Sequence, residues 1–311
     1  MTEQTFRSYT AEQGKTYVQN RLDYHPNLYN TVRTHHTSTG GQLDLLLDIG
    51  CGPGLAIANL APHFHHAIGL DPSEGMIATA RSRIPDLPKT ASGVPIRFEV
   101  STAEELGRNL ETPVADGSVD LIVIATAAHW FDMPAFWAAA ARVLKPSGTV
   151  AIWASGHMSV HPDMPQAAAI QDAMDKIEVQ YLQQHFVEGN WMTRNRYHGL
   201  GLPWTVEPKV LGFEEGSFVR KDWDARDEDF YAVGQPEVGL DALERMIGTG
   251  SPVTRWHEAN PELVGTEKDV VRMFRREIER LLREVGVEEG KERVRGATTG
   301  FLLMVKRDST A

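Results

Sequence analysis

Short apolar runs alternate with helical patterns through the middle of the chain. We expect strands at 44–48, 66–70, 96–100, 120–125 and 149–153, with helices at 55–60, 73–81 and 134–144 between them. Strands that alternate with helices at this spacing are typical of βαβ units. The pattern therefore predicts an α/β protein with a doubly wound, mostly parallel sheet.

The regions on either side of this alternation have a different pattern. Helical segments at 12–21 and 27–35 precede it, and we interpret residues 1–40 as an N-terminal helical lid. After residue 153 the alternation stops. A helical stretch at 166–186 and an aromatic, basic loop at 191–198 follow, so we expect 156–205 to be a cap inserted between sheet strands.

The core would then comprise 41–155 and 206–311. Within the second part we expect a strand at 213–223 and a last strand at 298–305. A strongly periodic helix at 266–285 lies between them, and its apolar stripe is expected to cover the sheet.

The end of the first strand carries the most informative motif. An apolar run from Leu45 to Leu47 ends in Asp48, and a turn with Gly50, Cys51, Gly52 and Gly54 follows and opens directly into a helix. Glycines are used where backbone must approach a ligand closely. The dinucleotide fingerprint G-x-G-x-x-G would need a third glycine at the position of Leu55, so this turn differs from it.

The second motif, Asp71-Pro72-Ser73, closes the second strand. An acid at this place can accept hydrogen bonds from both hydroxyls of a ribose, and Met76 lies one helical turn beyond Ser73. The alternative for Asp71 is a helix N-cap followed by proline at the first helical position.

Two further motifs follow the third and fourth strands. Thr102, Ala103 and Glu104 form one, for which a helix cap with Glu105 closing a capping box is an equal alternative. The other contains the small residues Ala125 to Ala128 and then His129-Trp130-Phe131, next to the first strand at the switch point where open α/β sheets bind ligands.

Five motifs in this order, from 43 to 153, resemble the class I S-adenosylmethionine-dependent methyltransferases; the fifth is the turn Leu144 to Val150. The resemblance implies a Rossmann-like, seven-stranded sheet, S-adenosyl-L-methionine as methyl donor and S-adenosyl-L-homocysteine as product. Thr102 departs from the family, which often has an acid there.

Within that family, Ala128-His129-Trp130-Phe131 and the N-terminal pattern Tyr17-x-x-x-Arg21-x-x-Tyr24 resemble the trans-aconitate methyltransferase-like group, which includes similar fungal proteins of secondary metabolism. That group methylates small molecules, including carboxylates. Where it tends to carry a Ser-Trp-Ser-like stretch, this chain has Phe230 to Val233.

The expected site residues fall into three sets. Cofactor-binding candidates are Tyr17, Arg21, Asp48, Gly50, Cys51, Gly52, Gly54, Asp71, Pro72, Ser73, Met76, Thr102, Ala103, Glu104, Ala125 and Thr126. Substrate-binding candidates are Tyr24, His129, Trp130, Trp191, Arg194, Arg196 and Trp204. For catalysis we expect His129 as a base, if the acceptor is a hydroxyl, and Trp130 as a pocket wall; packing is the alternative for both.

Composition and net charge limit the classes of molecule that the protein is expected to bind. A net charge of -11 argues against a nucleic acid, which needs a basic face, and no apolar run approaches the roughly 20 residues of a membrane helix. With Cys51 as the sole cysteine and no signal pattern in residues 1–6, we expect a cytoplasmic protein. The adjacent histidines at His35-His36 and at His65-His66 lack further ligands at metal-binding spacing, so no metal is expected.

The sequence therefore predicts methylation of a small molecule, with oxygen of a carboxylate or hydroxyl favoured. The alternative is a methyltransferase fold that catalyses a non-methylating step, such as a cyclisation, with the donor as a structural or electrostatic element. Neither the acceptor nor the oligomeric state follows from the sequence.

Overall fold

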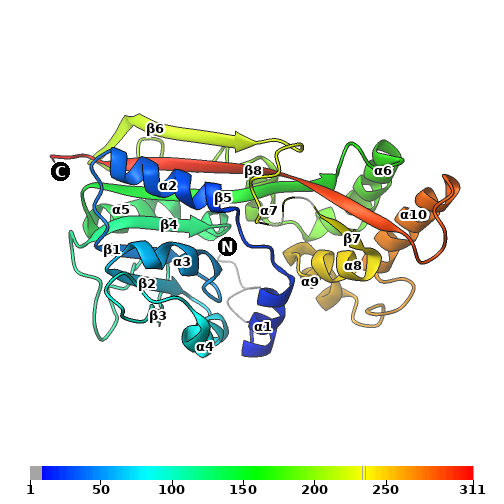
Figure 1. The fold of residues 1–311 in the computed structure, drawn as a ribbon, viewed down its shortest axis with the longest axis horizontal. Helices are drawn as coiled ribbons and strands as arrows, with labels where there is room; N and C mark the ends of the chain where they lie inside the picture. Colours follow the sequence, from blue (N-terminus) through cyan, green and yellow to red (C-terminus); the bar gives the residue numbers. More distant parts are fainter. Residues whose placement is uncertain (1–8, 233, 235, 311) are drawn as a thin grey trace.

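A single twisted sheet organises the molecule (Figure 1). The computed structural model describes residues 9–232, 234 and 236–310; the segment 1–6 and the first part of the expected lid lie outside them. The sheet has eight strands, and its main path runs in the order β3-β2-β1-β4-β5-β8-β6. The strands are β1 Leu45–Ile49, β2 His66–Asp71, β3 Arg97–Val100, β4 Val119–Ala125, β5 Leu144–Val160, β6 Phe213–Trp223, β7 Glu237–Gly239 and β8 Arg293–Arg307.

The strands from β1 to β5 are parallel, whereas β8 pairs antiparallel with β5, β6 and the short β7. This arrangement confirms the predicted doubly wound, mostly parallel α/β fold. The predicted strands and helices before residue 144 lie where expected, within three residues at each end.

Helices cover both faces of the sheet. On one face α5 Met133–Val143 buries Phe136 and Trp137 in a large apolar cluster. On the other face lie α2 Pro26–Ser38, α3 Leu55–Leu60 and α4 Glu74–Arg83, which supply Leu28, Ile57 and Ile77 to a second cluster. Because both faces are covered, the strand ends, rather than the faces, remain available to a ligand.

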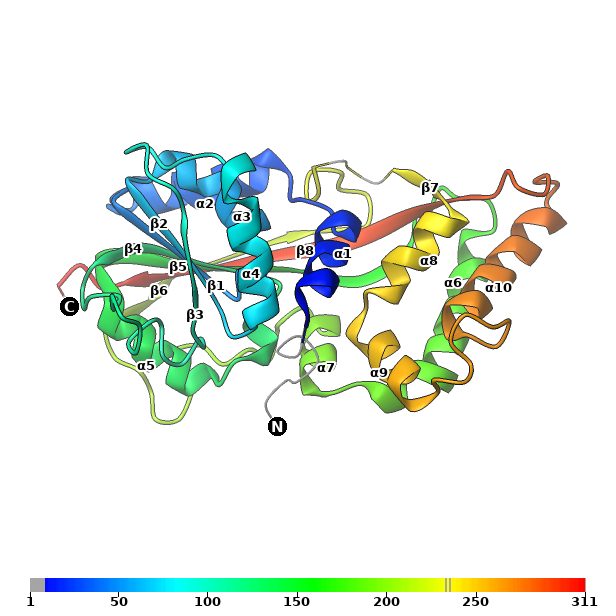
Figure 2. The same cartoon turned by 90° about the horizontal axis from the view of Figure 1, so that it is seen from below.

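A second, helical lobe is built on the long ends of β5 and β8 (Figure 2). After β5 come α6 Ala167–Ile177, the π-helix η4 Glu178–Leu182 and α7 Glu188–Arg194; before β8 come α8 Leu240–Gly248, α9 Ser251–Ala259 and α10 Val270–Glu284. Short 3₁₀ turns are η1 Ala61–His63, η2 Ile84–Asp86, η3 Ala128–Trp130 and η5 Gln183–His185.

The packing of α10 differs from the expectation. Its apolar stripe, with Phe274 and Ile278 buried, was expected on the sheet, but it packs on α6 and α8 in the helical lobe. An amphipathic pattern identifies a face to be buried but not the surface that buries it. The helical lobe consequently contains α8, α9 and α10 as well as the expected insertion at 156–205.

Three smaller expectations also need correction. The aromatic, basic stretch at 191–198 begins as helix α7, not as a loop, because the segment from 188 is helical. Residues 102–110 form turns without a helix, so the capping-box alternative at Glu105 is wrong. The turn at Pro146 to Gly148 is an irregularity within β5, where Ser147 has a φ of 62°.

Helix α1 Ala11–Asn20 lies between the two lobes (Figure 2). A capping box between Thr10 and Gln13 fixes its start, and its side packs closely on α4, where a methyl group at Gly75 would clash with the Tyr9 carbonyl. The helix ends at Asn20, and its C-cap residue Arg21 lies at the junction of the lobes. None of the described helices combines the length and the hydropathy that a membrane span requires.

Candidate functional site

The glycine-rich turn after β1 is held by the neighbouring strand. Gly50 has a φ of +65°, and a methyl group there would approach the side chain of Ala127 to 2.6 Å. Only glycine fits such a place without displacement. The N–H of Cys51 donates to the carbonyl of Leu70, and the N–H of Gly52 donates to Asp71 Oδ2 at 2.9 Å.

Asp71 thus shapes the turn as well as the start of the next helix. Its Oδ1 accepts a hydrogen bond from the N–H of Ser73 at 2.8 Å. The N-cap of α4 is Ser73, whose Oγ accepts from the N–H of Met76, so the alternative assignment of Asp71 as the cap is wrong. Asp71 itself lies in the wall of a cavity.

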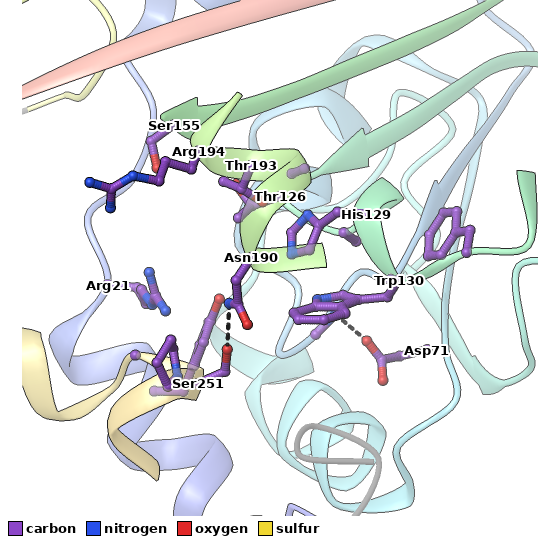
Figure 3. A pocket seen from close by; sticks show the side chains of 18 of the residues that line it. Arg21, Asp71, Thr126, His129, Trp130, Ser155, Asn190, Thr193, Arg194 and Ser251 are labelled. Atoms are coloured by element: carbon purple, nitrogen blue, oxygen red, sulfur yellow. Dashed lines mark hydrogen bonds between the residues drawn. The ribbon is translucent and has the colours of Figure 1, made fainter. Parts of the chain in front are cut away.

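This cavity lies at the carboxyl ends of β1, β2, β4 and β5 and has two adjoining halves. We call them the donor half, of about 380 Å³, and the cap half, of about 360 Å³. Their shared walls include Tyr17, Arg21, Thr126, His157 and Glu178. Figure 3 shows the donor half, with His129 and Trp130 on one side and Arg21 on the other.

Most expected cofactor-binding residues line the cavity. They are Tyr17, Arg21, Asp48, Gly50, Cys51, Gly52, Asp71, Pro72, Met76, Ala103, Glu104, Ala125 and Thr126. Of the expected substrate-binding residues, Tyr24, His129, Trp130 and Arg194 do so.

Six expected residues lie outside the walls. Gly54, with a φ of +82°, starts α3 against the ring of Phe98, and Ser73 caps α4. Trp191 packs on Phe186, and Trp204 packs on Phe218. The guanidinium of Arg196 bonds Asp222 Oδ1 at 2.6 Å, and Thr102 belongs to the turns after β3.

Two opposite charges face the cavity without an ionic partner. Asp48 is fully buried, and neither of its oxygens has a hydrogen-bond partner within 3.5 Å. Burial raises the pKa of its carboxyl well above the usual range, and the charge of Asp71 adds to this. A cationic ligand beside this carboxyl would favour its ionised form.

Arg21 is the cation. It stacks on the ring of Tyr17 at 4.8 Å, and one Nη donates to the carbonyl of Thr249 at 3.5 Å, while its buried Nε has no partner. No carboxylate among the described residues forms an ion pair with it. The surrounding tyrosines, Tyr17 first, raise the pKa of the guanidinium, which therefore stays charged.

His129 is held by a tyrosine from the helical lobe. Its Nδ1 shares a short hydrogen bond with the hydroxyl of Tyr197, and its ring lies 4.3 Å from that of Trp130. Burial, and secondarily the charge of Arg21, lowers the pKa of His129 to about 3. An imidazole with this pKa is neutral at pH 7 and holds a proton weakly, which makes it a poor general base.

Residues that the sequence analysis missed gather where the two halves meet. Arg194 bonds Glu178 Oε1 and lies 3.3 Å from Nδ1 of His157, and that nitrogen is 3.8 Å from Glu178 Oε2. Asn190, one turn before Arg194 on α7, donates to the hydroxyl of Ser251 at 3.0 Å (Figure 3). Arg194 was expected at the site, whereas His157, Glu178, Asn190 and Ser251 belong to no motif, so no signal in the sequence marked them.

A family model matches the part of the chain that carries the glycine-rich turn and the strands around it. Residues 47–152, about a third of the chain, match the family model described as a methyltransferase domain. A provisionally assigned methyltransferase of Dictyostelium discoideum is 35% identical over 146 residues, which cover 47% of this chain and 48% of that protein. For a provisionally assigned S-adenosylmethionine-dependent methyltransferase of Saccharomyces cerevisiae, CRG1, the identity is 30% over 133 residues, 43% of this chain and 42% of that protein.

The chain thus spans about half, or less, of the length of these curated relatives. A solved structure from Anaeromyxobacter dehalogenans, provisionally assigned as a type II methyltransferase, is similar over 93% of this chain and 97% of that one, with a TM-score of 0.58 and 21% identity. This likeness extends over both lobes and concerns the fold.

Proposed function

We propose that this chain, whose residues 47–152 belong to the class I S-adenosylmethionine-dependent methyltransferases, methylates an oxygen atom of a small molecule. The supporting observation is the pair of opposite charges in the cavity wall. The amino-acid end of S-adenosylmethionine carries one ammonium and one carboxylate. Asp48 and Arg21 offer it one buried carboxylate and one cation, neither of which has an ionic partner among the described residues.

The other walls of the donor half suit the rest of the molecule. Gly50 and Gly52 let backbone approach the ligand, and the carboxylate of Asp71, which binds the N–H groups of Gly52 and Ser73, lies in the same wall, where a carboxylate can accept hydrogen bonds from ribose hydroxyls. Met76 and Ala103 provide apolar surface for the adenine ring of the donor. We infer that these residues hold the donor, which supplies an electrophilic methyl group on a sulfonium.

The protein's task in such a reaction is mainly positioning. The sulfur is already a good leaving group, so the chain must hold the acceptor in line with the breaking bond and keep water out. The cap half adjoins the donor half at Thr126 and supplies that second ligand position. The net charge of -11 supports a small molecule over a nucleic acid as acceptor.

Calorimetric titration with S-adenosylhomocysteine tests the proposal. We expect binding, weakened by about 1–3 kcal/mol in Asp71→Ala through lost hydrogen bonds. Asp86→Ala, an exposed acid in η2, is the matched control and should bind like wild type. Wild-type protein that melts cooperatively yet does not bind would refute the proposal. Binding without turnover of S-adenosylmethionine on any acceptor would favour the non-methylating alternative.

A further inference from the structure

The cap half of the cavity extends from the glycine-rich turn, where Asp48 lies in its wall, to an apolar region formed by the helical lobe. Met174, Leu182, Met246, Val253 and Phe274 line it from α6, η4, α8, α9 and α10. The polar side chains His157, Glu178 and Arg194 lie where it opens into the donor half. The acceptor's body therefore contacts apolar surface, and its reacting end faces this polar group.

The charges at the mouth are already paired. Glu178 Oε1 binds Arg194, and burial together with the charge of Arg194 lowers the pKa of His157, so that this imidazole is neutral at pH 7. Arg194 and Arg21 are the arginines in the described walls, and the walls contain no lysine. If Arg21 holds the donor's carboxylate, no unpaired cation remains for an acceptor carboxylate, which would also face Asp175.

Glu178 retains one free oxygen. Oε1 is engaged by Arg194, whereas Oε2 has no hydrogen bond within 3.5 Å to the described residues and lies 3.8 Å from Nδ1 of His157. Glu178 is also the first residue of the π-helix η4, an irregular helical turn that is frequent at functional sites. It lines both halves of the cavity, so it lies beside the place where donor and acceptor meet.

We propose that Glu178 selects the acceptor: by neutralising Arg194 it excludes carboxylates, and with Oε2 it receives the hydroxyl of an uncharged, mostly apolar molecule such as a phenol. This inference rests on the proposed function. The hydroxyl proton passes to Oε2 as the oxygen forms its bond to the methyl carbon. The carbon–sulfur bond breaks, and its electron pair leaves a neutral thioether. Arg194 is a positioning residue that orients the carboxylate.

The test uses three probes that differ in one group: para-propylphenol, para-propylbenzoate and para-propylaniline. They are titrated into protein saturated with S-adenosylhomocysteine, and methylation is followed with S-adenosylmethionine. In wild type we expect the phenol to bind at least about tenfold more tightly than the benzoate, a difference of about 1.4 kcal/mol, and to be the methylated probe.

Glu178→Gln separates selection from a merely structural role. It should lower kcat for the phenol by about 100-fold or more at pH 7, with recovery toward pH 10, where a phenol ionises unaided. It should also raise benzoate affinity, because Arg194 becomes unpaired. Asp172→Asn, on α6 and exposed, is the matched control and should behave as wild type.

The outcomes distinguish the two proposals. If wild type fails to bind S-adenosylhomocysteine, the proposed function fails. If it binds, the selection by Glu178 is overturned by any of four results: benzoate binding as tightly as phenol, faster methylation of the aniline, no gain of benzoate affinity in Glu178→Gln, or no probe bound. Unchanged S-adenosylhomocysteine affinity in Glu178→Gln shows that this variant is folded. If that affinity is lost, Glu178→Asp is tested in place of Glu178→Gln. This second variant keeps the charge and should retain the preference for the phenol.

Discussion

The two halves of the cavity are built by different means. At the strand ends, the glycine-rich turn is fixed by Asp71, and the two charges beside it have no ionic partner among the described residues: Asp48 in the wall of the cap half and Arg21 in the walls of both halves. On the side of the helical lobe, side chains from five helical segments form the wall of the cap half, and Glu178 is paired with Arg194 of the donor half. The unpaired charges suit a charged ligand, whereas the paired ones suit a neutral one.

The largest effect should come from removing the unpaired anion. In Asp48→Asn we expect affinity for S-adenosylhomocysteine to fall by about 1.5–3 kcal/mol, or roughly 10- to 150-fold, because the ligand's ammonium loses its partner. The ligand-free protein should at the same time become more stable at pH 8, by about 1–3 kcal/mol, since a buried carboxylate without a partner is removed. Calorimetry and thermal unfolding measure the two changes.

The pH dependence of stability shows in which direction Asp48→Asn should change the stability of the ligand-free protein. Because the pKa of Asp48 is raised in the folded state, the folded protein holds this proton more tightly than the unfolded chain does. Its contribution to stability is therefore present below pH 3.8 and is lost as pH rises through the raised pKa. The advantage of the asparagine variant should shrink toward pH 4. Equal stability of both proteins at pH 8 would contradict this.

The unpaired cation should matter for the donor and not for the acceptor. Arg21→Met is expected to weaken binding of S-adenosylhomocysteine by about tenfold, with little change in phenol affinity of the saturated protein. Lys15→Met, an exposed position on the same helix, is the control. If Arg21→Met instead reduced acceptor binding alone, the assignment of the two charges to the donor would be wrong.

A change in the apolar region of the cap half should have the opposite selectivity. Met246→Trp fills space in the cap half, so kcat/KM for an accepted phenol should fall by about tenfold, or about 1.4 kcal/mol, largely through KM. Affinity for S-adenosylhomocysteine should stay within about twofold of wild type. A loss of donor affinity of similar size would show that the halves are not independent.

The smallest effect is expected at Arg196, which the sequence analysis placed in the substrate site. The structure pairs it with Asp222, away from the cavity, so Arg196→Met should change kcat/KM by less than about twofold. Steady-state kinetics measure this, and Arg194→Met, two residues away in the cavity wall, should be clearly impaired in the same assay.

The features that were predicted correctly from the sequence depend on residues that are close together in the chain. The turn from Asp48 to Gly54 and the strand that carries it are specified by neighbouring residues, and helix α3 lies where its pattern indicated. The apolar stripe of α10 was equally clear, but its partner surface is α6, about a hundred residues earlier in the chain. Pattern alone does not supply that information.

The substrate side was predicted less well for the same reason. Arg194 and Arg196 look alike in the sequence, yet α7 ends between them, and a left-handed φ of 55° at Arg196 turns the chain toward Asp222. Glu178 enters the cavity wall through a π-helical turn, whose spacing differs from that of an α-helix. His157 lies on the extension of β5, which no motif marks.

The pairing of β5 with β8 continues beyond β4 and β6, from Thr149 opposite Lys306 to Val160 opposite Gly296, with one irregularity between Ser155 and Met158. The helical segments that form the cap half are attached at the far ends of this two-stranded ribbon. In such an arrangement, helices at the ribbon's ends can be lengthened, shortened or exchanged. The pairing register of the strands near the glycine-rich turn stays unchanged. New acceptors can thus be acquired in this architecture by replacing chain at the tip of the ribbon, without rebuilding the end that serves the donor.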